Sequence, residues 1–383
     1  MKIVFLCGSL EPGRDGVGDY TRRLAGALIR QGYEALIVSL NDPFVQTDIQ
    51  EAQGVDETDV SVLRLPSLWP LNTRLHHSNK WIKTSDPSWL SLQFVPFSFH
   101  SRGLPFEMIR FFAEVGKGRR WHVMFHELWV GMDRQSSLKM ILWGNLQKQI
   151  IKSLMARLVP EVIHTQTLLY QAQLSHVNAR AGYLPLFSNI PHVNKPERGR
   201  GEAGPVLKKG SRVSFVVFGA IRPNVPISWF AKEAALYSKK TGLTVDLIVI
   251  GRSGPELQHW EKVWTSEGLE IKVLGEQSPC SISEVLKKAT VGISTTPITL
   301  VGKSGAVAAM LEHGLPVICV TNPWVIRGNI KVKSPDGVQE FQKGNLEFCL
   351  NSLKTVHPEF NVSSIARQFA LALSREMKVT EAS

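Results

Sequence analysis

Apolar runs and helically spaced apolar positions alternate along the first 190 residues of the chain. Residues 3–7 form a continuous apolar run that stops at Gly8, as in a strand buried on both faces of a sheet. Apolar residues recur at helical spacing over residues 21–31, and Gly32 ends this predicted helix. Further strands are predicted at 35–40, 60–65, 90–94, 122–125 and 162–165, and further helices at 106–115 and 138–158. Strands separated by helices predict a parallel, doubly wound sheet.

The alternation breaks off over residues 191–211, which are rich in proline, glycine and charge, and then restarts. Strands are predicted at 213–218, 244–250, 270–274, 291–294 and 316–320, and helices at 227–241, 282–288, 305–313 and 361–378. We therefore expect two Rossmann-like α/β domains, at 1–190 and 212–358, joined by a linker at 191–211. The terminal helical segment, 359–383, can cross back to the N-terminal domain. Such a pair of domains places a ligand cleft between the carboxyl ends of two parallel sheets.

Composition and charge narrow the class of protein. The 383 residues suffice for two domains, and the formal net charge of +11 is spread over both halves. A nucleic-acid domain would concentrate this charge and interleave aromatic residues, so we expect no nucleic-acid partner. The excess suits anionic small molecules and weak peripheral association with an anionic membrane surface, or it belongs to a merely basic soluble protein. There is no apolar stretch of membrane-spanning length, and the four cysteines are scattered, so we expect a reduced, cytoplasmic protein.

The segment from Gly8 to Thr21 joins the first predicted strand to the first predicted helix. Backbone N–H groups and a helix N-terminus at such a position can hold an anion, and Gly16 and Gly18 would let the backbone approach a ligand closely. The segment is not a dinucleotide fingerprint, because Leu10 stands where a glycine is required, and it lacks the Gly-Lys-Ser/Thr of a Walker A loop. The alternative interpretation is a flexible connection.

The triplet Lys303-Ser304-Gly305 opens a predicted helix of the second domain. Ser304 is suited to cap this helix, and Gly314 is suited to end it with a positive φ. Lys303 then lies at the positive end of the helix dipole, where an anionic ligand would recruit both the lysine and the exposed amides. The triplet is not part of a P-loop, because Pro297 replaces the first glycine of that motif. The alternative interpretation is a solvated lysine beside a short helix.

Other polar residues also follow predicted strands. Arg222 and Arg252 would point toward the same sheet edge as Lys303, and a guanidinium group suits bidentate phosphate binding. His126 stands at the carboxyl edge of the first sheet, where it could reach a sugar, although a histidine at a strand end is equally well explained as a structural residue. No third metal ligand accompanies His122 and His126, so we expect no metal site.

Four segments of the chain have a family likeness. They are Asp15-Gly-Val-Gly-Asp-Tyr-Thr21, Leu92-Gln-Phe-Val-Pro-Phe97, His126-Glu127 and Glu312-His-Gly-Leu-Pro-Val-Ile318. In this order they resemble elements of retaining GT-B glycosyltransferases, family four in particular, and the resemblance covers nearly the whole chain. It implies that Gly16 and Gly18 line the donor pyrophosphate and that His126 contacts the transferred sugar or the acceptor. It also implies that the Lys303-Ser304-Gly305 triplet meets the donor phosphate or sugar.

The chain departs from that family at specific positions. Val301 and Ala309 stand where the family has a pair of glutamates, and Ala220 stands where it has an arginine. The cations named above would substitute, and Glu312, one turn beyond Ala309, would face the same side of the helix. We therefore assign His126, Lys303, Arg222 and Glu312 to catalysis, and Gly16, Gly18, Arg252, Ser304 and Gly305 to donor binding.

The sequence thus predicts a GT-B glycosyltransferase that moves a sugar from a nucleotide diphosphate donor to an acceptor, with retention and without a metal. No cofactor is expected beyond the nucleotide sugar as co-substrate, and the acceptor can be a glycan, a lipid-linked molecule or a small molecule. The alternatives are a nucleotide-sugar epimerase on the same fold and a non-catalytic nucleotide-sugar-binding partner.

Overall fold

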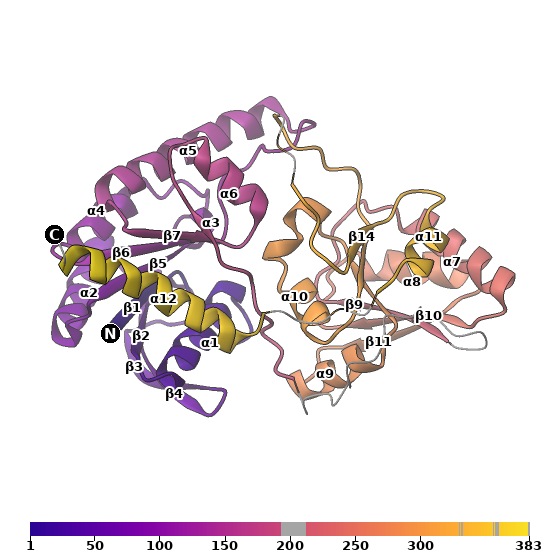
Figure 1. Cartoon of the computed structure of the whole chain (residues 1–383), viewed down its shortest axis with the longest axis horizontal. Coiled ribbons are helices and arrows are strands. Elements are labelled where there is room, and N and C mark those ends of the chain that lie inside the picture. Colours follow the sequence, from indigo (N-terminus) through magenta and orange to yellow (C-terminus); the bar gives the residue numbers. More distant parts are fainter. Residues whose placement is uncertain (193–211, 329, 331, 355, 357–359, 382–383) are drawn as a thin grey trace. The chain divides into compact units, whose positions relative to one another are not determined.

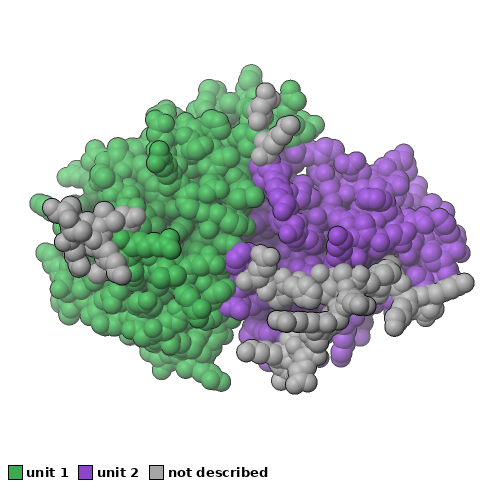
Figure 2. All heavy atoms as spheres, in the orientation of Figure 1, with its two compact units in different colours: residues 1–185, 325–330, 362–383 green, residues 186–324, 331–361 purple. Residues whose placement is uncertain are grey.

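The computed structural model describes residues 1–192, 212–328, 330, 332–354, 356 and 360–381. The chain divides into two compact units (Figure 2). Unit 1 comprises Met1–Pro185, Val325–Ile330 and Val362–Ser383, and unit 2 comprises Leu186–Trp324 and Lys331–Asn361. Most of the predicted linker, residues 193–211, lies outside the described residues.

Unit 1 is built on an eight-stranded sheet with the order β3-β4-β2-β1-β5-β6-β7-β8 (Figure 1). The strands are β1 (Lys2–Cys7), β2 (Glu34–Asp42), β3 (Ile49–Val55), β4 (Thr58–Pro66), β5 (Trp89–Phe94), β6 (Arg120–Phe125), β7 (Val162–Thr165) and β8 (Gly182–Tyr183). All neighbouring strands pair in parallel except β3, which forms an antiparallel hairpin with β4. Parallel pairing brings the carboxyl ends of β1, β2 and β4–β7 to one edge of the sheet.

Helices cover both faces of this sheet. They are α1 (Gly16–Arg30), α2 (Leu71–Ser85), α3 (Pro96–Phe99), α4 (Phe106–Val115), α5 (Leu138–Leu158), α6 (Leu168–Ser175) and α12 (Val362–Glu381). On one face, α12 packs beside α1, and Phe369 of α12 lies edge-on against His122 with the ring centroids 4.8 Å apart. On the other face, the neighbouring residue Trp121 packs against Phe112 of α4. Successive residues of β6 therefore point to opposite faces, as the pleat of a strand requires.

Unit 2 contains a six-stranded parallel sheet with the order β11-β10-β9-β12-β13-β14 (Figure 1). The strands are β9 (Val213–Phe218), β10 (Val245–Ile250), β11 (Glu270–Gly275), β12 (Val291–Ser294), β13 (Val317–Cys319) and β14 (Val338–Glu340). The helices are α7 (Ile227–Thr241), α8 (Leu257–Ser266), α9 (Pro279–Lys288), the 3-10 helix η1 (Ile298–Lys303), α10 (Gly305–Glu312) and α11 (Leu346–Asn351). On one face Phe215, Phe230 and Trp264 form an aromatic core, and on the other Val216 and Met310 are fully buried.

The predicted doubly wound α/β class is confirmed in both units, and several elements have their predicted bounds. Helix α1 differs, because it begins at Gly16 rather than at residue 21. Asp15 caps this earlier start, since its side chain accepts hydrogen bonds from the backbone N–H groups of Val17 and Gly18. Gly16 and Gly18 therefore lie in the first turn of a helix and not in an open loop.

Among the described residues, no helix is both long enough and apolar enough to span a membrane.

The two glycines at the start of α1 differ in the space around them. A Cβ atom at Gly18 would lie 2.5 Å from the carbonyl oxygen of Ser9, whereas a Cβ at Gly16 would meet nothing within 4 Å. We expect Gly18→Ala to lower the free energy of unfolding by about 1–3 kcal/mol, because backbone must move to relieve the overlap. Gly16→Ala is the matched control and should change it by less than about 0.5 kcal/mol. Urea unfolding measures both, and equal stability of the two variants would contradict this account.

Candidate functional site

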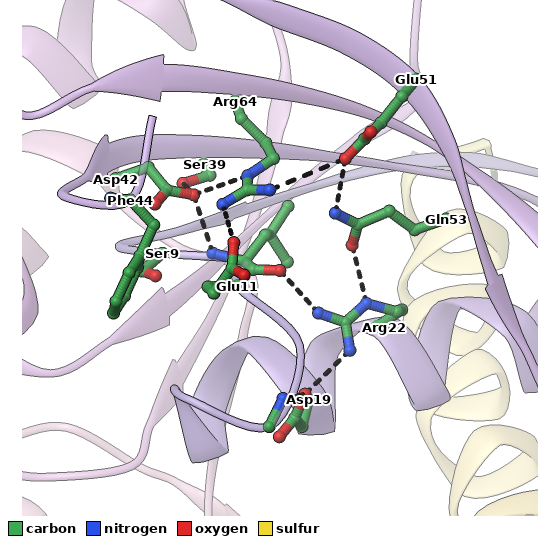
Figure 3. Close-up of polar contacts among 12 residues, drawn as sticks. Ser9, Glu11, Asp19, Arg22, Ser39, Asp42, Phe44, Glu51, Gln53 and Arg64 are labelled. Carbon is green, nitrogen blue, oxygen red and sulfur yellow. Dashed lines mark hydrogen bonds and ion pairs between the residues drawn. The ribbon is translucent and has the colours of Figure 1, made fainter. Parts of the chain in front are cut away.

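The loop between β1 and α1 lies at the carboxyl edge of the unit 1 sheet and is held by a buried ion pair (Figure 3). Asp42, at the end of β2, is completely buried, and Arg64 of β4 donates from Nε to its Oδ2 over 2.8 Å. The same oxygen accepts from the backbone N–H of Leu10, while Arg64 also donates to the carboxylate of Glu11. One guanidinium group thus joins β2 and β4 to the loop.

A second arginine holds the other side of this loop (Figure 3). Arg22 of α1 donates to the carbonyl oxygen of Leu10 over 2.7 Å, to Asp19 over 2.8 Å and to the side chain of Gln53 over 2.8 Å. Asp19 in turn accepts from the backbone N–H of Gly13. The loop is therefore pinned at several points by charged hydrogen bonds, which argues against a flexible connection.

A chain of buried polar side chains crosses β5, β6 and β7 beneath α1 and α12. His126 Nε2 lies 2.8 Å from Gln93 Oε1, Gln93 Nε2 lies 2.8 Å from Ser91 Oγ, and Ser91 Oγ lies 2.8 Å from His122 Nδ1. His122 Nε2 then lies 3.0 Å from Nδ1 of His164. Each of these residues is at least nine-tenths buried, so the chain replaces the water that they lose on folding.

The orientation of the Gln93 side-chain amide determines which group donates and which accepts in each of these hydrogen bonds. Its carbonyl oxygen accepts a hydrogen bond from His126 Nε2, and its amide nitrogen donates one to Ser91, whose hydroxyl then donates to His122. His126 consequently carries its proton on Nε2 and a lone pair on Nδ1. Burial lowers the pKa of His126 to about 4, while the amide of Gln166 acts against this shift. The imidazole is therefore neutral at pH 7, and it packs edge-on against the ring of Tyr20.

Two buried polar atoms accompany His126 at the unit 1 edge. The Ser9 hydroxyl follows β1, the Gln166 amide nitrogen follows β7, and neither has a hydrogen-bond partner within the described residues. An unsatisfied buried polar group is costly and needs an explanation. The edge thus offers neutral donors and acceptors, which suit hydroxyl groups of a ligand.

The corresponding edge of unit 2 carries cations. Arg222 follows β9, and its backbone N–H donates to Thr295 Oγ1 over 3.0 Å, which fixes this loop to the end of β12. Arg252 follows β10, with its side chain about half exposed and 3.6 Å from the carboxylate of Glu276. Lys303 ends η1, which follows β12. The structure therefore places the predicted cations in three loops at the same sheet edge.

Helix α10 begins at this edge in the way that the sequence predicted. Ser304 caps the helix by accepting from the backbone N–H of Val307, and Gly314 beyond its end has a φ of +74°. The backbone N–H groups of Gly305 and Ala306 bond to no partner among the described residues, and nothing lies within 4 Å of the Cβ position at Gly305. Two open amides at a helix N-terminus form a site that favours an anion.

Glu312 lies in the last turn of α10, and its predicted catalytic role stays a prediction. This residue ends α10, so it lies about 10 Å along the helix axis from the helix start at Gly305. Its carboxylate accepts a hydrogen bond of 2.8 Å from the backbone N–H of Ser188. Glu312 therefore ties the start of unit 2 to the carboxyl end of α10 and is not a carboxylate beside the helix start. Ala309 is completely buried and faces the core.

Two residues at the unit 2 edge were not predicted. The hydroxyl groups of Thr299, in η1, and Thr321, directly after the last predicted strand of that region, are buried without a hydrogen-bond partner among the described residues. For Thr321 the available signal was a hydroxyl directly after a predicted strand, whereas Thr299 lies within η1 and had no such signal. In unit 1, the polar residues Ser91 and Gln93 within an apolar run were the corresponding signal. Within the described chain, no three histidine, cysteine, aspartate or glutamate residues gather as ligands of a metal ion.

No family model matches the chain, and no curated protein matches it in sequence. Solved structures nevertheless match it in fold over nearly its whole length. Anabaena HepE, in complex with UDP and glucose, is 15% identical, with a TM-score of 0.59 over 98% of this chain and 99% of HepE. The chain has the GT-B fold.

Two further GT-B structures show how wide the likeness is. The lipopolysaccharide outer core galactosyltransferase WaaB is 13% identical, with a TM-score of 0.56 over 98% of this chain and 100% of WaaB. A putative UDP-N-acetylglucosamine 2-epimerase from Listeria monocytogenes is 10% identical, with a TM-score of 0.58 over 99% of this chain and 97% of the epimerase. The GT-B fold thus accommodates both transferases and epimerases among the proteins that this chain is similar to.

Removing the buried arginine of the loop tests its structural role. We expect Arg64→Met to lower the free energy of unfolding by about 3–5 kcal/mol, because the Asp42 carboxylate stays buried without its counter-ion. Lys2→Met, which breaks the exposed pair with Glu34 in the same unit, is the control and should cost less than about 1 kcal/mol. A similar loss in the two variants, measured by urea unfolding, would show that burial of the pair is not what matters.

The buried imidazoles predict a pH dependence. Burial lowers the pKa of His126 and His164 to about 4 and that of His122 well below its ordinary value. The unfolded chain takes up these protons as the pH falls below about 6.5, whereas the folded chain does not until about pH 4. Stability is therefore full above that window and is lost as the pH falls through it.

Substitution of one histidine measures its contribution to the pH dependence of the unfolding free energy. His164→Asn should reduce the slope of unfolding free energy against pH between 6 and 4.5 by up to about 1.4 kcal/mol per pH unit. His259→Asn is the matched control, because this imidazole is exposed to water in the folded chain. Urea unfolding at several pH values gives both slopes, and an unchanged slope for His164→Asn would refute the prediction.

Proposed function

We propose that this protein is a glycosyltransferase that transfers a sugar from a nucleotide diphosphate donor to an acceptor. One observation in unit 2 carries the proposal. The loops after β9, β10 and β12, at 219–226, 251–256 and 295–304, each contain one cation, and the one carboxylate among them is that of Glu256, directly before α8. The last of them leads into a helix whose first two amides bond to no described residue. This combination suits the diphosphate of a nucleotide sugar.

In the proposed reaction, unit 2 binds the donor and stabilises the leaving diphosphate. Negative charge develops on the diphosphate as the bond to the sugar breaks, and Lys303, Arg222 and the start of α10 are placed to stabilise that charge. Arg252 contributes less, because Glu276 lies beside it. We propose that these cations serve in place of a metal ion and that no cofactor other than the nucleotide sugar is required. We also propose that the anomeric configuration of the sugar is retained during transfer. This part of the proposal rests on the family resemblance.

Unit 1 is proposed to bind the acceptor and the transferred sugar. His126 is neutral and presents a lone pair on Nδ1, so it can accept a hydrogen bond from a hydroxyl group. Ser9 and Gln166 supply further polar atoms at the same edge. Gly18 contacts Ser9, and its amide already binds Asp15, whereas the Cβ position at Gly16 is open. The proposal that Gly16 and Gly18 line the donor pyrophosphate is kept and rests on the family resemblance.

We place the protein in the cytoplasm, because its cysteines suit a reducing compartment. Cys7, Cys280, Cys319 and Cys349 are all free thiols, and burial raises the pKa of Cys7, Cys319 and Cys349.

A nucleotide-sugar epimerase is the second candidate, because epimerases are among the similar structures. Epimerisation needs acid and base groups beside the sugar, and the three unit 2 loops contain a single carboxylate, that of Glu256. Incubation with a donor alone separates the two functions, because only an epimerase yields an isomeric nucleotide sugar. Binding of the donor in calorimetry without turnover over a broad acceptor panel would instead indicate a non-catalytic binding protein.

Substitution of the unit 2 cations tests the mechanism once a donor has been identified by thermal-shift screening of UDP-, GDP-, ADP- and TDP-sugars. We expect Lys303→Ala to lower kcat about 100-fold, the typical loss for one electrostatic stabiliser of the transition state. Arg222→Ala should have a larger effect than Arg252→Ala, which is partly neutralised. Lys262→Ala, an exposed lysine of α8, is the matched control. Normal kinetics in Lys303→Ala would remove this residue from the mechanism.

A further inference from the structure

Helix α5 is apolar on two opposite faces. One face is buried against unit 1 through Ile150, Ile151 and Leu154. On the other face Leu138, Leu142 and Leu146 recur every four residues and form a stripe along the first half of the helix, with Leu138 80% and Leu142 67% exposed. A helix at the surface of a globular protein normally keeps its outward face polar. The leucine stripe is therefore not explained by the packing of unit 1.

The charges on α5 are all of one sign. Its 21 residues contain Lys139, Lys148, Lys152 and Arg157 and not one aspartate or glutamate. Lys139, Lys152 and Arg157 are exposed, and they form no ion pair within the described residues. Lys148 instead lies over the ring of Trp129. Exposed helices usually pair opposite charges at a spacing of three or four residues, and α5 does not.

The loop after α3 packs against another side of α5. Trp143 Nε1 donates to the carbonyl oxygen of Arg102, and Gln147 Nε2 donates to that of Gly103. The ring of Phe97 lies 2.8 Å from the Cβ position at Gly103, and it is 45% exposed. Figure 1 shows α5 along the outside of unit 1. The exposed leucine side chains of α5 thus share this helix with charged residues that are all basic.

We propose that this leucine stripe of α5, with its basic border, docks the protein on the surface of an anionic lipid bilayer. Leucine side chains would enter the boundary between headgroups and acyl chains, while the lysines and arginine meet anionic headgroups. A second copy of the chain does not fit the same face, because two α5 helices would bring eight positive charges together without a counter-charge. An extended negative surface with an apolar interior complements both properties of the helix.

Vesicle sedimentation tests this docking without a donor or an acceptor, so its outcome is independent of the proposed transferase activity. We expect the full chain to bind vesicles that contain phosphatidylglycerol, to bind phosphatidylcholine vesicles more weakly, and to dissociate from the anionic vesicles as the salt concentration rises. The double variant Leu142→Gln/Leu146→Gln should weaken the partition coefficient at least about tenfold. Lys139→Gln/Lys152→Gln/Arg157→Gln should weaken binding to anionic vesicles and leave the weak binding to neutral ones unchanged.

Leu68→Gln is the matched control, because this leucine of unit 1 is 78% exposed but lies outside α5. It should leave binding unchanged, and all three variants should unfold at the same urea concentration as the parent chain, because the substituted side chains are exposed. Absence of binding by the parent chain would overturn the proposal. So would equal binding by the Leu142→Gln/Leu146→Gln and Leu68→Gln variants. Salt-sensitive capture by an acidic protein without vesicle binding would assign the surface to a protein partner instead.

Discussion

Parallel strand pairing is the constraint on which the candidate site depends. In a parallel sheet every strand ends at the same edge. Residues that follow different strands are therefore brought to that edge by strand pairing alone, even when they are far apart in sequence. Arg222, Arg252 and Lys303 are brought to one edge of unit 2 in this way. Ser9, His126 and Gln166 are brought to one edge of unit 1 by the same rule. The two edges differ in chemistry, with cations and helix amides on one and neutral polar groups on the other.

The sequence predicted most of this framework because its buried elements have strong apolar patterns. Helices α4, α5 and α7 have their predicted bounds, since each places a regular apolar stripe on a sheet. Strand β3 and helix α2 were not predicted. Only Gln53 is buried in β3, and only Ser78 and Ile82 are buried in α2, so neither element has enough apolar positions to set a period.

Site residues were harder to predict, because their roles depend on contacts across the sheet. Ser304 and Gly314 were predicted correctly, since caps are local features of the chain. The position of Glu312 in the last turn of α10 agrees with the predicted helix at 305–313, but spacing could not show that its carboxylate accepts a hydrogen bond from the backbone N–H of Ser188. The early start of α1 was also not predicted. Gly16 and Gly18 have low helix propensity, and the cap supplied by the side chain of Asp15 was not recognised. Gln93 acquires its role only when β5 pairs with β6.

The chain of hydrogen bonds from His126 to His164 behaves as a single switchable unit. Every link passes through a group that can exchange the parts of donor and acceptor: an imidazole, a hydroxyl or a primary amide. A half-turn of the Gln93 amide would reverse all the links together, leave each group satisfied and move the lone pair of His126 from Nδ1 to Nε2. The tautomer of His126 at the sheet edge is thereby tied to that of His164, buried in the adjacent strand β7, through the rotation of one amide.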